Sequence, residues 1–407
     1  MKLLLSAFAC APNVGSEGGV GWRWALELAR LYEVTVVTDA TRRTAIEQEL
    51  AAHPVDNLNF IYFRPGWLAR VPLNSTTAQV LYTAWQFALL PFARALHRRR
   101  TFDLAIHITY GVFRHPSFLG WLGIPFIFGP LGGGEDAPLK LKRSIRGSEK
   151  LKEILRTLIN KLALLDPFLW LAYARATVIL VKTEDTRRAL PWPFRRRARV
   201  YPEIGFDAID GVRLPVRQPG EPLRVLFAGR LLGWKGAHLA IRAVALALQR
   251  GVQVEFTLVG RGPYESELRR TAREVSVHDR IRWIRQMPQH ELFALYETMH
   301  CFLFPSLHDS SGNVVLEAQA KGLPVICLDI GGPATLVTPQ TALVVSTRGL
   351  DEAAVIQQLA DAIRTLAEDE PRRGEMARAA AAHVTATMTW KNRVEGALAL
   401  VKKPETT

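Results

Sequence analysis

Short apolar runs alternate with segments of helical length along the whole chain, and this alternation limits the fold more than any other feature. In the first half the runs are "KLLLSAFA", "VTVVT", "LNFIYF", "FDLAIHITY", "PFIFGP" and "TVILVKT". In the second half they are "LRVLFAG", "VEFTLVG", "IRWI", "CFLFPS", "PVICLD" and "ALVVS". Near-continuous apolar strands separated by helices are typical of parallel sheets covered on both faces. The sequence therefore predicts an α/β protein with doubly wound sheets.

A stretch rich in glycine and proline, residues 205–222, separates the two halves and lacks any periodicity. Such a composition is typical of a domain boundary. We predict a first Rossmann-like domain over 1–205 and a second over 206–385. A final amphipathic helix, about 386–403, is expected to pack back on the first domain. Two doubly wound domains that face one another leave a crevice, and the carboxyl ends of their strands can line it.

Positive charge is concentrated in the first half of the chain. Residues 1–205 contain 28 Lys and Arg against 16 Asp and Glu, whereas 206–407 contain 24 against 22, so +12 of the net +14 lies in the first half. Such an excess indicates an anionic partner, either nucleic acid or a membrane surface, unless the charges are only solvated.

The segment 139–165 has the spacing of a basic amphipathic helix, with Leu151, Ile154, Leu155 and Ile159 on one side. Its cations include Lys142, Arg143, Arg146 and Lys150. We expect this helix to lie on an anionic membrane. The competing interpretation is that its apolar side is buried in the protein.

A polar loop in the second half, "HDSSGNVVLEAQAKGLPVICLD", places two carboxylates, Asp309 and Glu317, between a buried strand and the next strand. The pattern predicts strand, loop, helix and strand in turn. In such a unit the free N–H groups of the helix N-terminus face the crevice and favour an anionic ligand.

The loop in "VLFAGRLLGWKGAHLAIRAV" holds two cations, Arg230 and Lys235, between a strand and a helix. Its glycines let the backbone approach a ligand closely, and the two cations can reach phosphate oxygens. Two positive charges at a strand-to-helix crevice suit a diphosphate, although arginine and lysine are also common on ordinary turns.

These loops, together with "LVGRGPYESELR" and the order in which they occur, resemble the second domain of the family 4 glycosyltransferases. That family is retaining, uses nucleotide sugars and has the GT-B fold, in which two Rossmann-like domains face a central crevice. Its signature is a pair of acidic residues with seven between them, which Asp309 and Glu317 match. The first acid is usually glutamate, and here it is the shorter aspartate. "PNVGSEGGVGWRWALELA", "IHITYGVFRHPSFL" and "GPLGGGE" extend the resemblance to the first domain.

The resemblance implies a role for each motif residue. Glu317 would hold the ribose, Asp309 the hydroxyls of the transferred sugar, and Arg230 and Lys235 the diphosphate. His107 would approach the donor sugar, unless it is a hydrogen-bonded core residue. The sugar or phosphate would also meet the backbone of the loop and helix start, at Ser310, Ser311, Gly312, Asn313 and Val314.

Two glycine-rich loops of the first half complete the predicted site. "GSEGGVGW", with Gly15, Gly18 and Gly19, would close over the donor phosphates or the acceptor. A dinucleotide fingerprint is disfavoured there because the third glycine that its spacing requires is replaced by Trp24. "GPLGGGE" offers Gly133, Gly134 and Glu135 as an acceptor loop, or is a simple turn.

No Asp-x-Asp pair and no His/Cys cluster with metal-ligand spacing occurs in the sequence. We therefore expect no metal and no other cofactor, because Arg230, Lys235 and a helix dipole can stabilise the leaving group. The three cysteines, Cys10, Cys301 and Cys327, lie in or beside apolar runs and are expected to be buried thiols.

We predict a retaining, metal-independent glycosyltransferase that moves a sugar from a nucleotide-sugar donor to a glycan or lipid-linked acceptor of the cell envelope. It is expected to be cytoplasmic and peripheral on the inner face of the membrane. "MKLLLSAFACAP" is predicted to be a first strand rather than a signal peptide, and no apolar run reaches the roughly 18 residues of a spanning helix.

Two alternatives remain at this point. One is a sugar-nucleotide epimerase or hydrolase on the same fold, and the other is a basic nucleic-acid-binding module. The basic run "RRRAR" lacks the interleaved aromatic residues that single-stranded nucleic acid needs, so we expect no nucleic acid partner.

Overall fold

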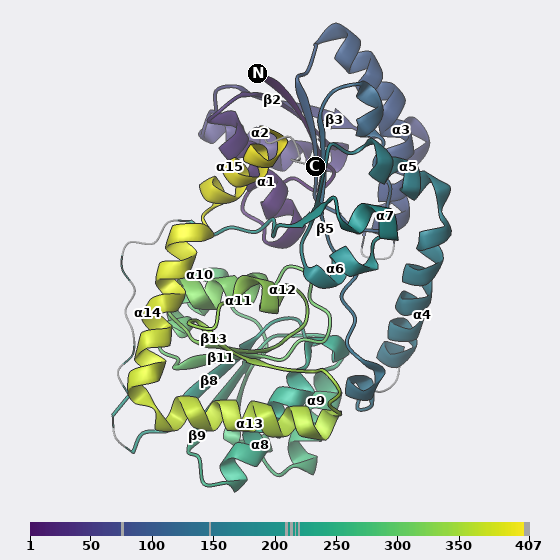
Figure 1. Cartoon of the computed structure of the whole chain (residues 1–407). Coiled ribbons are helices and arrows are strands. Elements are labelled where there is room, and N and C mark those ends of the chain that lie inside the picture. The colour runs from purple at the N-terminus through teal and green to yellow at the C-terminus, as the bar shows by residue number, and fades with distance from the viewer. Residues whose placement is uncertain are drawn as a thin grey trace. The chain divides into compact units, whose positions relative to one another are not determined.

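The computed structural model describes residues 1–74, 77–145, 148–207, 211, 215, 217–218 and 220–402. The chain forms two compact units, each built around one sheet (Figure 1). The first unit contains residues 1–134, 159–204 and 390–407, and the second contains 135–158 and 205–389. The predicted α/β class with two doubly wound sheets is confirmed.

Within the described residues, the first unit has a parallel sheet of seven strands in the order β3-β2-β1-β4-β5-β6-β7. The strands are β1 (Lys2–Ala7), β2 (Glu33–Asp39), β3 (Leu58–Phe63), β4 (Leu104–Ile108), β5 (Phe126–Leu131), β6 (Val178–Val181) and β7 (Ala198–Val200). The helices are α1 (Ser16–Ala29), α2 (Arg43–Ala52), α3 (Ala78–Arg99), α5 (Pro167–Arg175), α6 (Glu184–Ala189), α7 (Trp192–Arg195) and α15 (Trp390–Lys402). Helix α4 (Ser148–Leu162) begins in the second unit and ends in the first.

The second unit has six described parallel strands in the order β10-β9-β8-β11-β12-β13. They are β8 (Leu223–Ala228), β9 (Val254–Val259), β10 (Ile281–Ile284), β11 (Cys301–Phe304), β12 (Val325–Leu328) and β13 (Ala342–Val345). The helices are α8 (Ala237–Gln249), α9 (Glu265–Glu274), α10 (Gln289–Tyr296), α11 (Asn313–Ala320), α12 (Gly331–Leu336), α13 (Glu352–Glu368) and α14 (Glu370–Thr387).

Strand order reverses at one point in each sheet, between β1 and β4 in the first unit and between β8 and β11 in the second. The connections leave these neighbouring strands in opposite directions, and the crevice beyond their carboxyl ends is where open α/β sheets bind ligands. All the predicted apolar runs form strands. Strand β7 was not predicted, because it has only three residues and lies in the basic run at 195–199.

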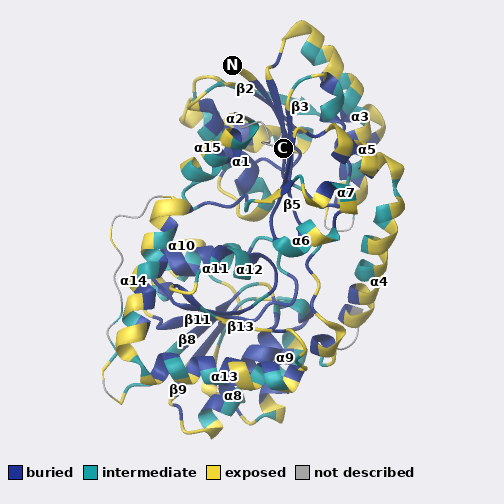
Figure 2. Cartoon of the chain, viewed as in Figure 1, coloured by how far each residue is buried: buried dark blue, intermediate teal, exposed yellow. Residues whose placement is uncertain are grey.

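The core of each unit consists of the strands and the inner sides of the helices, whereas the outer helix faces are exposed (Figure 2). The largest enclosed side chains of the first unit include Trp85 and Phe128, and those of the second include Phe227 and Phe302. Cys10, Cys301 and Cys327 are buried free thiols, as predicted. No helix in the described residues is both long and apolar enough to cross a membrane.

The limits of the two units differ from the predicted domains in one important segment. Residues 135–158 were predicted in the first domain, but they group with the second unit, because their side chains bond to residues of that unit. The last helix, α15, groups with the first unit and packs against α1.

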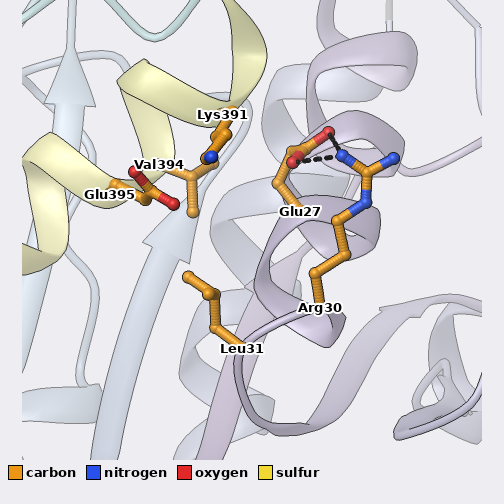
Figure 3. Close-up of a pocket in the computed structure, with 6 residues that line it drawn as sticks. All are labelled: Glu27, Arg30, Leu31, Lys391, Val394 and Glu395. Carbon is orange, nitrogen blue, oxygen red and sulfur yellow. Dashed lines mark hydrogen bonds and ion pairs between the residues drawn. The ribbon is translucent and has the colours of Figure 1, made fainter.

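A small cavity of about 310 Å³ opens between α1 and α15 (Figure 3). Glu27 of α1 and Arg30, which directly follows α1, line it and form an ion pair at 2.8 Å, and Lys391 and Glu395 line it from α15. The cavity lies where α1 ends and the chain turns into the amino end of β2, so it is at the edge of the sheet opposite the carboxyl ends of the strands.

Gly236 lets the loop after β8 touch the loop after β11. Its φ is +74°, and a Cβ there would lie 1.8 Å from the carbonyl oxygen of Pro305. We predict that Gly236→Ala lowers the free energy of unfolding by about 3 kcal/mol or more, because overpacking adds to backbone strain. Gly251 is the matched control, since its φ is +86° with nothing within 4 Å of a Cβ. Gly251→Ala should cost only the strain, about 1 kcal/mol. Urea denaturation measures both, and equal losses would contradict the prediction.

Candidate functional site

Two loops of the second unit meet where the strand order reverses. The lysine loop, residues 229–236, follows β8, and the aspartate loop, residues 305–312, follows β11. Strands β8 and β11 are parallel neighbours, with Val225 opposite Cys301, so both loops leave the same edge of the sheet. Helices α8 and α11 begin directly after the loops, which directs backbone N–H groups toward this edge.

An ion pair joins the two loops. Lys235 Nζ contacts Asp309 Oδ2, and the two side chains are only 15% and 13% exposed. The lysine also lies over the rings of Trp234, at 4.6 Å, and Phe304, at 5.2 Å. Burial acts to raise the pKa of Asp309, but the charge and hydrogen bond of Lys235 and the N–H of Gly312 outweigh it, so the pKa is lowered. Asp309 is therefore a carboxylate at neutral pH.

Backbone hydrogen bonds hold the aspartate loop in place. The Gly332 N–H donates to the carbonyl of Asp309 at 2.7 Å, and the Gly312 N–H donates to Asp309 Oδ1 at 3.3 Å. Gly312 has φ +70° and immediately precedes α11, whose first residues are Asn313 and Val314. The amide oxygen of Asn313 is buried and has no hydrogen-bond partner in the described part of the chain.

The second carboxylate, Glu317, lies one turn into α11 and is partly buried. Its Oε1 accepts a hydrogen bond from Gln289 Nε2 at 3.2 Å. Burial raises the pKa of Glu317 to about 7, although the hydrogen bonds from Gln289 and Tyr296 act in the opposite direction. Near neutral pH this side chain is thus divided between its neutral and charged forms, and a ligand hydroxyl that donates to it would favour the carboxylate.

Arg230 lies on the lysine loop, and its side chain is exposed. Among the described residues no ion pair or side-chain hydrogen bond of Arg230 is present, which leaves its guanidinium available to an anionic ligand. The structure therefore brings Lys235 and Asp309 into contact and places Arg230 and Glu317 on the same loop–helix units.

Glu135 and Ser310 are also brought together. Glu135 is fully buried, and its carboxylate accepts a hydrogen bond from the Ser310 hydroxyl. It was predicted as part of an acceptor loop with Gly133 and Gly134. The two glycines stay in the first unit, whereas Glu135 packs beneath the aspartate loop of the second. Gly134 is needed for packing, because a Cβ there would lie 2.6 Å from Thr186 Cα.

The first glycine-rich loop forms the start of α1. Gly15 caps the helix and has open space around it, whereas a Cβ at Gly19 would lie 2.2 Å from the carbonyl oxygen of Val14. Gly18 accepts a hydrogen bond from the Ala11 N–H at 3.1 Å. A Cβ at Gly18 would lie 2.8 Å from Val14 Cγ2, so close packing accounts for Gly18 and Gly19 without a ligand, whereas Gly15 is sterically open.

His107 is enclosed in the first unit, which agrees with the alternative that it is a hydrogen-bonded core residue. It is 1% exposed, its Nε2 lies 2.9 Å from the Tyr82 hydroxyl, and burial lowers its pKa to about 3. The reason is that β4 is a central strand covered on both faces, so that all five of its residues are buried. The strand is followed by Thr109, which is also buried, and Tyr110, which is partly exposed, and both have positive φ, of 70° and 49°.

Sequence reasoning missed three residues that contact the site, namely Trp234, Glu153 and His308. The rings of Trp234 and His308 lie 4.1 Å apart, and His308 Nε2 lies 2.8 Å from Glu153 Oε1. The position of His308 directly before Asp309 was the one available signal. Glu153 gave none, because it is one charge among many on a segment predicted to form a basic amphipathic helix.

The fold and the site agree with what comparison to known proteins finds. Residues 213–383 match the family model described as "Glycosyl transferases group 1". The D-inositol 3-phosphate glycosyltransferase of Corynebacterium glutamicum is 28% identical over 93% of this chain and 90% of its own length. That of Corynebacterium aurimucosum is 34% identical, but the match spans only 41% of either protein. WcaL of Escherichia coli, named for colanic acid biosynthesis, is 31% identical over 30% of this chain and 32% of its own length.

Solved structures show the same architecture. Sucrose-phosphate synthase from Thermosynechococcus elongatus superposes with a TM-score of 0.63 at 19% identity, over 98% of both chains. HepE of Anabaena in complex with UDP superposes with a TM-score of 0.61 at 17% identity, over 98% of this chain and 99% of that one. The protein is thus a glycosyltransferase with the GT-B fold. The match to the group 1 glycosyltransferases covers residues 213–383, which lie in the second unit.

The raised pKa of Glu317 predicts a pH-dependent effect of Glu317→Gln. Between pH 4.5, the ordinary value, and about 7, the folded protein holds a proton that the unfolded chain has lost, so this group's contribution to stability falls as the pH rises. Glutamine cannot ionise. The Tm of the variant relative to wild type should therefore be unchanged at pH 4, rise through this window and level off above pH 7.

Thermal unfolding from pH 4 to pH 8 measures this difference. The matched control is Glu291→Gln on α10, which removes one carboxylate from an exposed position. A Tm difference for Glu317→Gln that stays constant over the whole pH range would contradict the burial of this carboxylate.

Proposed function

We propose that this enzyme transfers a sugar, with retention and without a metal, from a nucleotide-sugar donor to a glycan or lipid-linked acceptor of the cell envelope. The observation that carries the proposal is the buried Lys235–Asp309 pair at the strand reversal of the second unit. Beside it, the exposed Arg230 has no ionic partner among the described residues. A largely buried ion pair beside an unpaired exposed arginine is expected where a charged ligand binds.

The charges match the chemistry of a nucleotide-sugar donor. Arg230 and Lys235 complement the diphosphate, whose negative charge grows as the bond to the sugar breaks. Together with the N-terminus of α11 they supply the positive charge that a divalent metal supplies elsewhere. Asp309, held as a carboxylate, accepts hydrogen bonds from sugar hydroxyls, and Glu317 accepts them from the ribose. The UDP complex of HepE supports a nucleotide as ligand.

Retention is proposed from the family resemblance of the two acidic residues. The lowered pKa of Asp309 supports a role in orienting the sugar rather than in proton transfer, because a carboxylate paired with Lys235 is a weak base at neutral pH. His107 is not included among the proposed catalytic residues, because its ring is enclosed in the first unit.

Helix α4 supports a lipid-linked acceptor, because its apolar side is exposed and its polar side faces the protein. The inward side consists of polar residues, namely Glu149, Glu153, Arg156, Thr157 and Asn160. The outward side carries an apolar stripe whose members are 41–68% exposed, namely Leu151, Ile154, Leu155, Leu158, Ile159 and Leu162. This exposure favours the membrane interpretation over the one in which the protein buries the stripe.

Lysines flank the apolar stripe of α4. At 100° per residue, Lys150 and Lys161 lie along one border of the stripe and Lys152 along the other, and all three are exposed. An apolar face bordered by cations is typical of a helix that lies in the interface of an anionic membrane. Lys142 does not contribute, because it is buried against Asp136 and Glu153, and Arg146 lies outside the described residues.

The chemistry of the surface and the names of relatives point in the same direction. A polybasic first half, a lipid-compatible helix and the relative named for colanic acid biosynthesis together support envelope glycan or glycolipid synthesis at the cytoplasmic face of the membrane. A peripheral enzyme would meet lipid-linked acceptors there while drawing its donor from solution.

Arg230→Ala tests the donor site without disturbing the fold. The loss of a charged hydrogen bond of about 1.5–3 kcal/mol predicts a tenfold to hundredfold fall in kcat/KM with an unchanged Tm. Nucleotide release is measured over UDP-, GDP- and ADP-sugars, with UDP affinity measured by calorimetry. Arg282→Ala, an exposed arginine of edge strand β10, is the matched control. Wild-type turnover in Arg230→Ala would remove this residue from the site. Product analysis with and without an acceptor separates transfer from hydrolysis or epimerisation.

Vesicle sedimentation tests the membrane surface of α4. Replacing Leu151, Leu155 and Leu158 by serine should abolish binding to anionic vesicles, because full burial of each leucine stabilises by about 1.5–3 kcal/mol. Replacing Lys150, Lys152 and Lys161 by glutamine should weaken binding and its salt dependence, at about 1 kcal/mol for each lysine. The control is Val80→Ser on α3, at a position 73% exposed. Unchanged binding of the serine variant, or no binding by wild type, would contradict a membrane role.

A further inference from the structure

Residues 135–158, here termed the inserted segment, come from the first half of the chain but pack in the second unit. They include a short 3-10 helix at Leu139–Lys142 and most of α4. At one end of the segment the Ser144 hydroxyl and N–H bond to Glu352 of α13, and the Ser144 carbonyl accepts from the Tyr264 hydroxyl at 3.0 Å. These bonds attach the inserted segment to the unit that holds the donor loops.

A buried lysine organises the carboxylates of the inserted segment. Lys142, 7% exposed at its side chain, contacts Asp136 and lies 2.9 Å from Glu153 Oε2. Burial acts to raise the pKa of Glu153, but the hydrogen bonds from His308 and Lys142 and the charge of Lys142 lower it below its ordinary value. Glu153 is thus a carboxylate whose two oxygens bond to two different partners.

His308 is the second partner of Glu153. Its Nε2 lies 2.8 Å from Glu153 Oε1, and burial lowers the pKa of the imidazole, so the neutral ring donates its Nε2 proton to the carboxylate. The other side of the ring lies against Trp234, with centroids 4.1 Å apart. Trp234 directly precedes Lys235, and His308 directly precedes Asp309. The ring therefore connects the inserted segment to both residues of the ion pair.

Glu135 supports the same loop from a second point. Its buried carboxylate accepts a hydrogen bond from the Ser310 hydroxyl. Its side chain also packs against Gly331, where a Cβ would meet Glu135 Cγ at 3.2 Å and the Asp309 carbonyl oxygen at 2.4 Å. Residues on both sides of Asp309 are thus held by carboxylates of the inserted segment.

We propose that Glu153 and Glu135 are positioning residues, which fix Asp309 and Lys235 for sugar transfer through His308 and Ser310. This inference rests on the proposed donor site. The physical reason is that a carboxylate and an ammonium group catalyse only when they are held within a fraction of an ångström, and a displacement of about 1 Å can reduce the rate about a hundredfold. Neither glutamate touches the substrate.

Substitutions at His308 isolate this role. His308→Phe keeps a ring against Trp234 but cannot donate to Glu153, whereas His308→Gln restores an N–H donor. We expect kcat to fall about ten- to a hundredfold in His308→Phe and to recover in part in His308→Gln. The affinity for UDP should fall by a smaller factor than kcat in both variants, because Arg230 and Glu317 remain in place even where Lys235 is displaced. Glu135→Gln, which retains an oxygen acceptor for Ser310, should keep more activity than Glu135→Ala.

Ser144→Ala is the matched control, since it loses a bond of the inserted segment to Glu352 that does not involve the aspartate loop. It should lower the Tm without lowering kcat. Turnover is measured with the nucleotide sugar that wild-type enzyme consumes. If wild type neither binds UDP nor releases nucleotide from any donor, the proposed donor site itself fails. If wild type is active and His308→Phe turns over equally fast, or if His308→Phe loses UDP affinity as much as kcat, only the positioning role is overturned.

Discussion

The ion pair between Lys235 and Asp309 is the contact on which the rest of the site depends. It joins two loops that leave the neighbouring parallel strands β8 and β11, between which the strand order of the described sheet reverses. Both charges are largely removed from water, so each needs the other, and the removal of either leaves an uncompensated charge. The close backbone contact at Gly236 and the hydrogen bonds around Gly312 and Gly332 hold the pair in this arrangement.

Helix α4 has two surfaces with different tasks. Its polar side faces inward, where Glu153 bonds to His308, and its apolar side faces outward between lysines. An ordinary surface helix has the reverse arrangement, because apolar side chains are normally removed from water by the protein itself. An exposed apolar side is expected if the acyl region of a membrane covers it. The helix that is proposed to lie on a membrane is then also the helix that holds the aspartate loop.

The strands and the charged loops of the second unit were predictable because each depends on local sequence. Apolar runs form buried strands wherever helices cover both faces, and the Gly-rich loop with Arg230 and Lys235 lies where such a strand ends. Strand β7 was not predicted, because three residues are too few to show the alternation of apolar and polar residues that identifies a strand. The sequence left two interpretations of His107 open, since a histidine at the end of an apolar run does not show whether its side of the strand is covered.

The sequence by itself determined the two doubly wound sheets, the spacing of Asp309 and Glu317, and the polarity of each side of α4. Those properties depend only on local sequence, that is, on residues within one helix turn or one strand of each other. Only the tertiary structure decided that residues 135–158 join the second unit, that Glu153 meets His308 across 155 positions, and that the polar side of α4 turns inward. The physical reason is that a buried carboxylate is stable only beside a donor, and the chain brings that donor from far away in the sequence.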